Sequence, residues 1–578
     1  MIRELLPGWE MNHSEEHGMF QKLDHRVGHY LLFAIIWAIC SLPNLGGPTL
    51  WDIDEGLNAE AAREMLASGN YVVPTFNYKL RSAKPALLYW LQVASYKVFG
   101  VNEAAARLPS SLAAFLAILG VYEFGRFALG LRAALLAGVI LATSIGVLGA
   151  AHFANPDALL LAFTTWTMCF YFRYWQGRNP VFLHAAAIAC GFAVLAKGPV
   201  GFLLPAAIIF WFLVWQRDLK RLVDWRLGEA FLLFFLVAAP WYIWVGVETK
   251  GAFLRDFWHT HHMNRVTTPM EKHGGSPFYY LVVLVLGFLP WSIFLGMTIW
   301  NTVRQLGRAD DSITPAFRFL VVWFGLFFVG FSVVSTKLPN YILPLYPAGV
   351  LLTAAMLDRW RTGTLGQPGW TTHAALASLF LTGVISSLVL LVISGTVELE
   401  AVRWQFPDMK PWVWIGIFPL VGAVVSWWLW VREKRDAILV TLSVAGLGFV
   451  STIAAGPLEG LNDYKTSRHL ARNLPADQLQ RDVRLGAYRY DRPSLVFYCQ
   501  REVKRLDVEE QTLDFLKSPL PSYVFLQDVR WQEIADKVPA GVRVLGRYPD
   551  LYGKGQEVLV ITNVRTPGEG VAVGGSEP

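Results

Sequence analysis

Charged residues and cysteines are scarce in this chain. Asp, Glu, Lys and Arg make up 16% of its 578 residues, whereas soluble proteins average about 25%. Three of the four cysteines fall inside apolar runs, so we expect neither a disulfide framework nor a cysteine metal site. No glycine-rich phosphate loop follows a predicted strand, and the basic residues are spread over short loops. The sequence therefore argues against a nucleotide-binding site and against nucleic-acid binding.

Long apolar runs are abundant. Hydrophobic residues make up 54% of the chain, the mean hydropathy is +0.38, and 24 Trp, 37 Phe and 20 Tyr suit a lipid-facing surface. Runs long enough to cross a bilayer core of roughly 30 Å begin near His29, Leu108, Ala133, Ala158, Val181, Val200, Glu229, Pro277, Ala316, Tyr341, Thr371, Trp412 and Ala437. We therefore expect an all-α polytopic membrane bundle of about 13 transmembrane helices.

One further apolar run, at 84–100, is short and contains Gln92 and Lys97. If it does not cross, the short basic loops all fall on the cytoplasmic side, as the positive-inside rule requires. These loops contain Arg126, Arg173, Arg217, Arg304, Arg359 and Arg432. We therefore predict that 84–100 is a helix in the outer interface, tucked against the bundle. The first outer loop then spans 46–107, another spans 248–276, and the C-terminus is outside.

The composition changes after Gly456. We predict a transmembrane domain at 1–455 and a small α/β domain, outside the membrane, at 456–565. The expected strands are 482–488, 522–528 and 558–563, and the expected helices are 462–474, 510–518 and 531–538. The tail at 566–578 is rich in Gly and Pro and is expected to be disordered.

Acidic residues gather just after the first apolar run. Asp54 and Glu55 stand at the entrance of a short predicted helix, at membrane depth, where a carboxylate must be paired or functional. Asp54 could also simply cap this helix. Glu60 and Glu64 are four residues apart with Arg63 between them, and we expect these three to form a solvated face.

Cations with no place in the positive-inside pattern are predicted on the outer side. Lys84, Lys197 and Lys337 each lie at the outer end of an apolar segment, with Arg107, Arg265 and Lys272 in nearby outer loops. Any one lysine could be snorkelling to the interface. Together they indicate a bound anion, and lysine binds phosphate well. A phosphate at membrane depth implies a lipid carrier.

Other polar residues on the outer side allow two interpretations. Asp157 begins an apolar run, either as a first-turn acid or as a functional carboxylate. A histidine group could hold a metal, although its spacing matches no recognised site; it consists of His259, His261, His262 and His273. The sequence therefore leaves a metal undecided, with a divalent cation possible.

Several motifs resemble the GT-C membrane glycosyltransferases that use polyprenyl-phosphate sugars, and among these the bacterial 4-amino-4-deoxy-L-arabinose transferases that modify lipid A. The matching stretches are "DEGLNAEAAREMLASGNYVVP" from Asp54, "AKPALLYW" around Lys84, "RLPS" from Arg107, His262 with Arg265, His273 with "SPFYY", and "KLPNYILPLYP" from Lys337. The resemblance covers about 20–460 well. The family often has Arg-Tyr where Leu57 and Asn58 stand here, and an acid where Ala83 stands.

The resemblance implies a fold, an activity and a site. The fold would be a GT-C bundle in the bacterial inner membrane, with the active site and the C-terminal domain periplasmic. The enzyme would transfer aminoarabinose from undecaprenyl phosphate to a lipid A phosphate with inversion, among membrane lipids and with no required cofactor. Asp54, Glu55 and Asp157 would be catalytic. The substrate-binding residues would be Tyr78, Lys84, Arg107, Lys197, His262, Arg265, Lys337, Tyr341 and Tyr346.

Three alternatives remain at this point. A GT-C enzyme could move another sugar, such as mannose, to protein or to another lipid. A transporter would also have many spans, but it should place ionisable groups near span centres, whereas here they lie at span ends. The C-terminal domain could be a module that recruits the acceptor.

Overall fold

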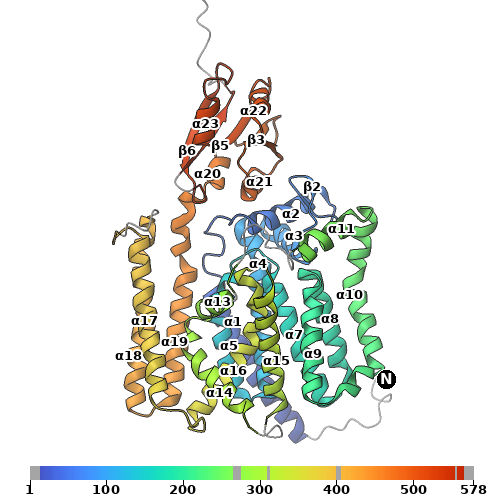
Figure 1. The fold of residues 1–578 in the computed structure, drawn as a ribbon, viewed down its shortest axis with the longest axis vertical. Helices are drawn as coiled ribbons and strands as arrows, with labels where there is room; N and C mark the ends of the chain where they lie inside the picture. Colours follow the sequence, from blue (N-terminus) through green and yellow to red (C-terminus); the bar gives the residue numbers. More distant parts are fainter. Residues whose placement is uncertain are drawn as a thin grey trace, which may run out of the picture.

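A bundle of long helices carries a small mixed sheet on one end, which we call the sheet end (Figure 1). The computed structural model describes residues 13–264, 275–276, 278–308, 313–398, 405–553 and 556–564. The predicted tail at 566–578 and part of the predicted loop at 248–276 lie outside these residues.

The helices of the bundle match the predicted apolar runs one for one. Eight are long and apolar enough to span a membrane: α4 (Glu103–Ala128), α8 (Pro180–Lys197), α10 (Arg226–Glu248), α15 (Pro315–Val333), η5 with α16 (Pro339–Arg361), α17 (Trp370–Ile393), η6 with α18 (Pro407–Val431) and α19 with η7 (Arg435–Tyr464). Two bent pairs follow the same criteria, α5 (Leu131–Ala142) with α6 (Ile145–Ala151) and α13 (Tyr279–Gly287) with η3 and α14 (Trp291–Leu306). The other runs are α1 (His13–Ser41), α7 (Asp157–Gly177) and α9 (Val200–Trp215). The expected all-α polytopic bundle is confirmed.

Short elements cover the sheet end of the bundle. They are α2 (Asp54–Ser68), β1 (Thr75–Phe76), β2 (Lys79–Leu80), α3 (Leu87–Phe99), α11 (Ala252–Trp258) and the π-helical turn η2 (His259–Met263). The helix α3, predicted not to cross, has 13 residues. At 1.5 Å per residue it reaches about 20 Å, which is too short for the bilayer core.

The C-terminal sheet has five strands in the order β4-β3-β5-β7-β6. The strands β3 (Arg484–Tyr488), β5 (Ser522–Gln527) and β7 (Glu557–Thr562) are the expected ones, whereas β4 (Val503–Leu506) and β6 (Arg543–Pro549) were not predicted. The first three in that order are parallel, and β7 pairs antiparallel with β5 and β6. Its helices are α20 (Ser467–Ala471), α21 (Pro493–Cys499), α22 (Glu509–Leu516) and α23 (Asp528–Ile534), and apolar clusters pack on both faces of the sheet.

Hydrogen bonds fix the sheet domain on the loop that joins α1 to α2. Asp52 accepts from the backbone N and the hydroxyl of Ser494 at 2.8 and 2.7 Å. Asn462 Oδ1 accepts from the backbone N of Thr49 at 2.8 Å. A Cβ at Gly56 would clash with the backbone of Ser494, so glycine is required for α2 to approach α21 this closely. The two parts of the chain therefore form one packed unit at this point.

The expected solvated face of α2 is wrong. Glu60, Arg63 and Glu64 are buried, because α3, α21 and the β1–β2 hairpin cover this helix. Arg63 binds Glu60 through two hydrogen bonds of 2.7 Å. Glu64 accepts from the hydroxyl of Thr75 at 2.5 Å and so ties the hairpin to α2. Arg63 thus compensates the charge of Glu60, whereas Glu64 is held by hydrogen bonds from Thr75 and from the backbone N of Tyr78.

Candidate active site

The acidic entrance of α2 contains a buried ion pair. Glu55 is 0% exposed and Arg107, on α4, is 1% exposed. Two hydrogen bonds of 2.8 Å join them, and Glu55 also accepts from the backbone N of Ala154 at 2.7 Å. The remaining N–H groups of Arg107 donate to the backbone carbonyls of Leu45, Pro48 and Thr49. This geometry favours a structural role for both residues, which the sequence had suggested as catalytic and substrate-binding.

Electrostatics keep Glu55 ionised in this buried position. Burial by itself raises the pKa of a carboxyl. The charge and the hydrogen bonds of Arg107 outweigh that effect and hold the pKa of Glu55 below its ordinary value. A buried charge of this kind is tolerated only when it is paired and hydrogen-bonded.

Asp54 differs from its neighbour. It is the first residue of α2 and is half-buried. Its carboxylate makes no hydrogen bond and no ion pair with another described residue. The backbone geometry also shows no side-chain cap at this helix start. Of the two adjacent carboxylates, Asp54 is therefore the one available to a substrate.

A second carboxylate centre lies at the start of α7. Asp157 is buried and pairs with Lys197, the last residue of α8. Its other oxygen accepts from Asn340 Nδ2 at 2.5 Å. Lys197 also lies 5.0 Å from the ring centre of Tyr341. The structure thus brings three predicted site residues together and adds Asn340, which the sequence analysis missed.

Lys337 and Tyr346, both predicted to bind substrate, have side chains that are buried and contact other parts of the protein. Lys337 is buried and donates to the carbonyls of Ser332 and Val334 at 2.8 and 2.9 Å, so it caps the end of α15. Burial lowers the pKa of Lys337. Tyr346 is buried against α6 and α13, and a Cβ at Gly287 would clash with its hydroxyl.

Lys84 and Tyr78 lie on the segment between α2 and α3. Lys84 is half-buried and stands three residues before α3 begins. The Tyr78 side chain is 56% exposed, and its backbone N donates to Glu64. His262 belongs to η2, but the structure does not describe its side chain. Arg265 lies outside the described residues.

Arg81 is a buried cation that the sequence analysis did not single out. It is 8% exposed, and its guanidinium donates to Tyr89 Oη and to Asn58 Oδ1, each at 3.0 Å. Asn58 in turn donates to the carbonyl of Ala154 at 3.0 Å. The turn before α7 therefore connects Arg81, the Glu55 ion pair and Asp157 at the sheet end of the bundle.

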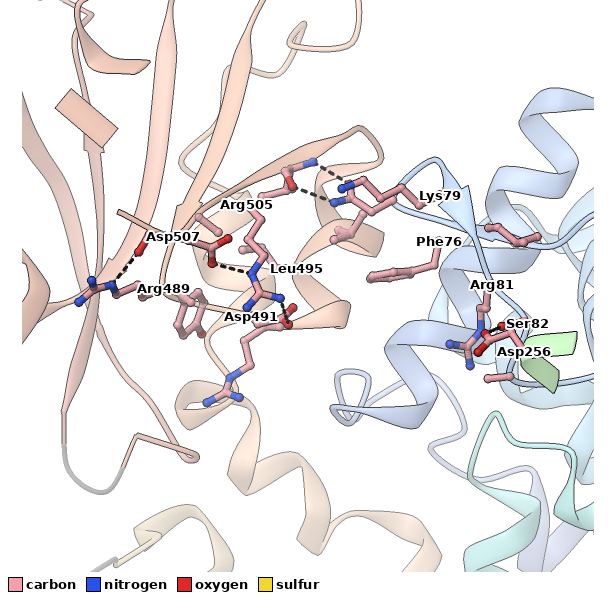
Figure 2. Close-up of a pocket in the computed structure, with 18 of the residues that line it drawn as sticks. Phe76, Lys79, Arg81, Ser82, Asp256, Arg489, Asp491, Leu495, Arg505 and Asp507 are labelled. Atoms are coloured by element: carbon pink, nitrogen blue, oxygen red, sulfur yellow. Dashed lines mark hydrogen bonds and ion pairs between the residues drawn. The ribbon is translucent and has the colours of Figure 1, made fainter. Parts of the chain in front are cut away.

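A cavity of about 590 Å³ opens next to Arg81, and we call it the charged cleft. One wall comes from the hairpin segment and α11, and the other from the sheet domain, as Figure 2 shows. Ionisable side chains on its lining are Lys79, Arg81, Asp256, His261, Arg489, Asp491, Arg492, Arg505 and Asp507. Ser82 and Ala83 also line it, so the cleft borders the segment that carries Lys84. Cations outnumber acids on this lining.

The described residues contain no group of three or more His, Cys, Asp or Glu side chains arranged to hold a metal ion. His261 Nε2 lies 3.8 Å from Asp256 Oδ2. Since His262 and His273 fall outside what can be described, the histidine metal site stays a prediction.

Lys465, where η7 meets the sheet domain, gives a testable pH dependence. It is buried, donates to the carbonyl of Thr49 and lies 4.0 Å from the Trp51 ring centre. Burial lowers its pKa from 10.5 to about 7. Above pH 7 the folded protein has lost this proton while the unfolded chain still holds it, so stability rises with pH.

Above pH 7 we expect the free energy of unfolding to rise more steeply with pH in wild type than in Lys465→Met. The difference between the two slopes should reach up to about 1.4 kcal/mol per pH unit. Below pH 7 both states are protonated, and the difference between the proteins stays constant. Thermal unfolding in detergent from pH 6 to 9 measures this. If stability changed with pH in the same way in both proteins, the pKa of Lys465 would be the same in the folded and unfolded states, which would contradict this prediction.

Comparisons with known proteins agree with this geometry. Residues 83–244 match the family model described as dolichyl-phosphate-mannose-protein mannosyltransferase. An uncharacterized protein of Aquifex aeolicus is 30% identical over 478 residues, covering 82% of this chain and 88% of that protein. The undecaprenyl phosphate-alpha-4-amino-4-deoxy-L-arabinose arabinosyl transferase of Shewanella sediminis is 28% identical over 465 residues, covering 78% of each chain.

A solved structure shows the same fold. The crystal structure of ArnT from Cupriavidus metallidurans bound to undecaprenyl phosphate superposes with a TM-score of 0.78 at 24% identity, covering 94% of this chain and 99% of that chain. The bundle, the elements on its sheet end and the C-terminal sheet are therefore a GT-C architecture, as expected. The chain is a multi-pass membrane glycosyltransferase, and it is similar over most of its length to the undecaprenyl-phosphate aminoarabinose arabinosyl transferases.

Proposed function

We propose that the protein transfers 4-amino-4-deoxy-L-arabinose from undecaprenyl phosphate to a phosphate of lipid A. The observation that carries this proposal is the relationship to arabinosyl transferases of that name over 78% of the chain. The described side chains support it, because cations and carboxylates meet at one end of the bundle. Transfer is driven by cleavage of the sugar–phosphate bond, so the reaction requires no nucleotide.

The orientation follows from the charges at the two ends of the bundle. Arginines in the last turns of α4, α14 and α16, and directly after α7, α9 and α18, lie at the end opposite the sheet. Under the positive-inside rule that end is cytoplasmic. The sheet end, with the sheet domain proposed at 456–565, then faces the periplasm of a bacterial inner membrane, while 1–455 forms the transferase bundle.

In the proposed mechanism Lys84 neutralises the phosphate that leaves the sugar. A fixed cation in a water-poor site stabilises developing negative charge strongly, since the low dielectric leaves it unscreened. The acceptor phosphate attacks the anomeric carbon from the opposite face as the bond to the leaving phosphate breaks, which inverts the configuration. Asp54 orients the acceptor or binds the cationic amine of the sugar.

Asp54→Asn separates orientation from base catalysis. A phosphate monoester has a second pKa near 6, so the acceptor is ionised at neutral pH and needs no base. We expect Asp54→Asn to keep transfer to lipid A within about tenfold of wild type, measured as initial rate in vesicles at pH 7.5. A loss of a thousandfold or more in a folded variant would instead identify Asp54 as an obligatory base.

The function can be tested in a bacterial host that makes the aminoarabinose donor but lacks its own transferase. Mass spectrometry of lipid A compares the empty vector with the wild-type chain. We expect a mass increase of one aminoarabinose unit only with the chain. Unmodified lipid A despite good expression would contradict the proposal and favour another sugar, or a protein acceptor of the kind named in the matching family model.

A further inference from the structure

We propose that the charged cleft binds the phosphorylated sugar headgroup of the acceptor lipid, with Arg81 as its fixed anion partner. This inference rests on the proposed function, because it assumes that the acceptor carries a phosphate. A direct transfer between two lipids requires both headgroups to be bound at once. With the donor phosphate at Lys84, a second anion site must lie beside it.

Arg81 is a buried cation whose charge no described carboxylate pairs with. Its two hydrogen bonds go to neutral oxygens, of Tyr89 and Asn58, and it makes no ion pair with any described residue. A buried charge is costly unless an opposite charge accompanies it. Since Arg81 lines a cavity instead of solid protein, a bound anion can supply that charge.

The other cations of the cleft add to this positive potential. The Lys79 ammonium makes no hydrogen bond or ion pair with a described residue. Arg489 donates through Nε to the backbone carbonyl of Asp507 at 2.9 Å, which leaves its charge uncompensated by that bond. Arg505 is paired, at 2.8 Å from Asp507 and 3.6 Å from Asp491. In Figure 2 the hairpin wall carries Lys79 and the sheet-domain wall carries Arg505 with its two acids, while the Arg489 guanidinium points away from the hairpin wall.

The lining fits a phosphosugar better than a bare phosphate. Phe76 and Leu495 contribute apolar surface from the two walls, as Figure 2 shows. Carboxylates of the cleft can accept hydrogen bonds from sugar hydroxyls. A cavity of about 590 Å³ is also within the size range of small-molecule sites and much larger than one phosphate needs.

The position of the cleft assigns it to the acceptor. Ser82 and Ala83 line it and Lys84 follows directly in sequence, so an occupant would lie beside the donor phosphate. The second wall comes from the sheet domain, and every lining residue on both walls except Ala83 lies outside the part of the chain that matches the mannosyltransferase family model. An acceptor headgroup in the cleft would therefore lie next to the donor site without occupying it.

Calorimetric titration of the full chain in detergent with glucosamine 1-phosphate tests this proposal without requiring transfer. We expect salt-sensitive binding to wild type, and at least about tenfold weaker binding to Arg81→Gln. Because Arg81→Gln could misfold, the double variant Lys79→Gln/Arg489→Gln tests the exposed cations separately and should also bind about tenfold more weakly. The matched control is Lys517→Gln/Arg530→Gln, on the same domain but outside the cleft, which should bind as wild type does.

Two further ligands separate the possible occupants. Inorganic phosphate should bind more weakly than glucosamine 1-phosphate, and undecaprenyl phosphate should bind the double variant as it binds wild type. The proposal is overturned if wild type shows no binding at millimolar glucosamine 1-phosphate, or if the cleft variants bind normally. Equal affinity for inorganic phosphate, or an equal loss of undecaprenyl phosphate binding, would overturn it too. Failure of lipid A modification alone would contradict the proposed function and leave this binding result standing.

Discussion

Replacing Lys84 with alanine is expected to lower aminoarabinose transfer by about 10² to 10³-fold, the usual cost of removing one electrostatic contact to developing charge. Lys84 would be the cation that faces the leaving phosphate, so its removal leaves that charge without compensation in the transition state. Initial rates with purified protein in vesicles measure the effect. Because the side chain is half-buried in a loop, the variant should remain folded.

Two companion variants make this result specific. Lys84→Arg keeps the positive charge and should recover part of the rate, although its geometry differs from that of lysine. Lys97→Ala, at the other end of α3, removes an exposed lysine that lies over Tyr71 and should leave the rate unchanged. Near-normal transfer by folded Lys84→Ala would eliminate Lys84 as the phosphate anchor.

Breaking the Glu55–Arg107 pair is expected to destabilise the protein by about 3 to 5 kcal/mol, because each single substitution leaves the other charge buried and uncompensated. Arg107→Met should have this effect most strongly, since it also frees three loop carbonyls. Thermal unfolding in detergent measures the loss. The double variant Glu55→Gln/Arg107→Met should be less destabilised than the sum of the two single variants.

An exposed ion pair serves as the control for the buried Glu55–Arg107 pair. Lys517→Ala breaks a 3.0 Å pair with Asp514 on the surface of the sheet domain, and the melting temperature should stay unchanged. If Glu55→Gln unfolds like wild type but has lost transfer, Glu55 belongs to the chemistry, as the sequence first suggested. A stability loss with residual transfer in the folded fraction supports the structural role.

Long apolar runs made the bundle predictable from the sequence. Bilayer thickness fixes the length of a spanning helix, and the basic loops decide which runs can cross. Each long helix of the bundle begins near a predicted apolar run, and α3, within 84–100, is shorter than the helices that qualify as spans. In the sheet domain, β4 and β6 were missed. Their residues alternate weakly, as "VKRL" in β4 shows, and β6 carries a bulge between Val544 and Gly546.

The partners of the charged residues were harder to predict, because most of them come from distant parts of the chain. Glu55 pairs with Arg107 on α4, and Asp157 pairs with Lys197 on α8. The charged face of α2 looked solvated because the α21 segment that covers it lies more than 400 residues away. Arg81 could have been suspected from the sequence, since it is a basic residue three positions before Lys84 on the predicted outer side. Its burial without a carboxylate was visible only in three dimensions.

The central claim is tested most directly by reconstituting the purified protein in vesicles with undecaprenyl-phosphate aminoarabinose and lipid A. Mass spectrometry then follows both lipids. The account predicts that lipid A gains one aminoarabinose unit while an equal amount of undecaprenyl phosphate is released, and that Lys84→Ala does so at least about a hundredfold more slowly than wild type. Unchanged lipid A in the presence of folded wild-type protein and intact donor would contradict it.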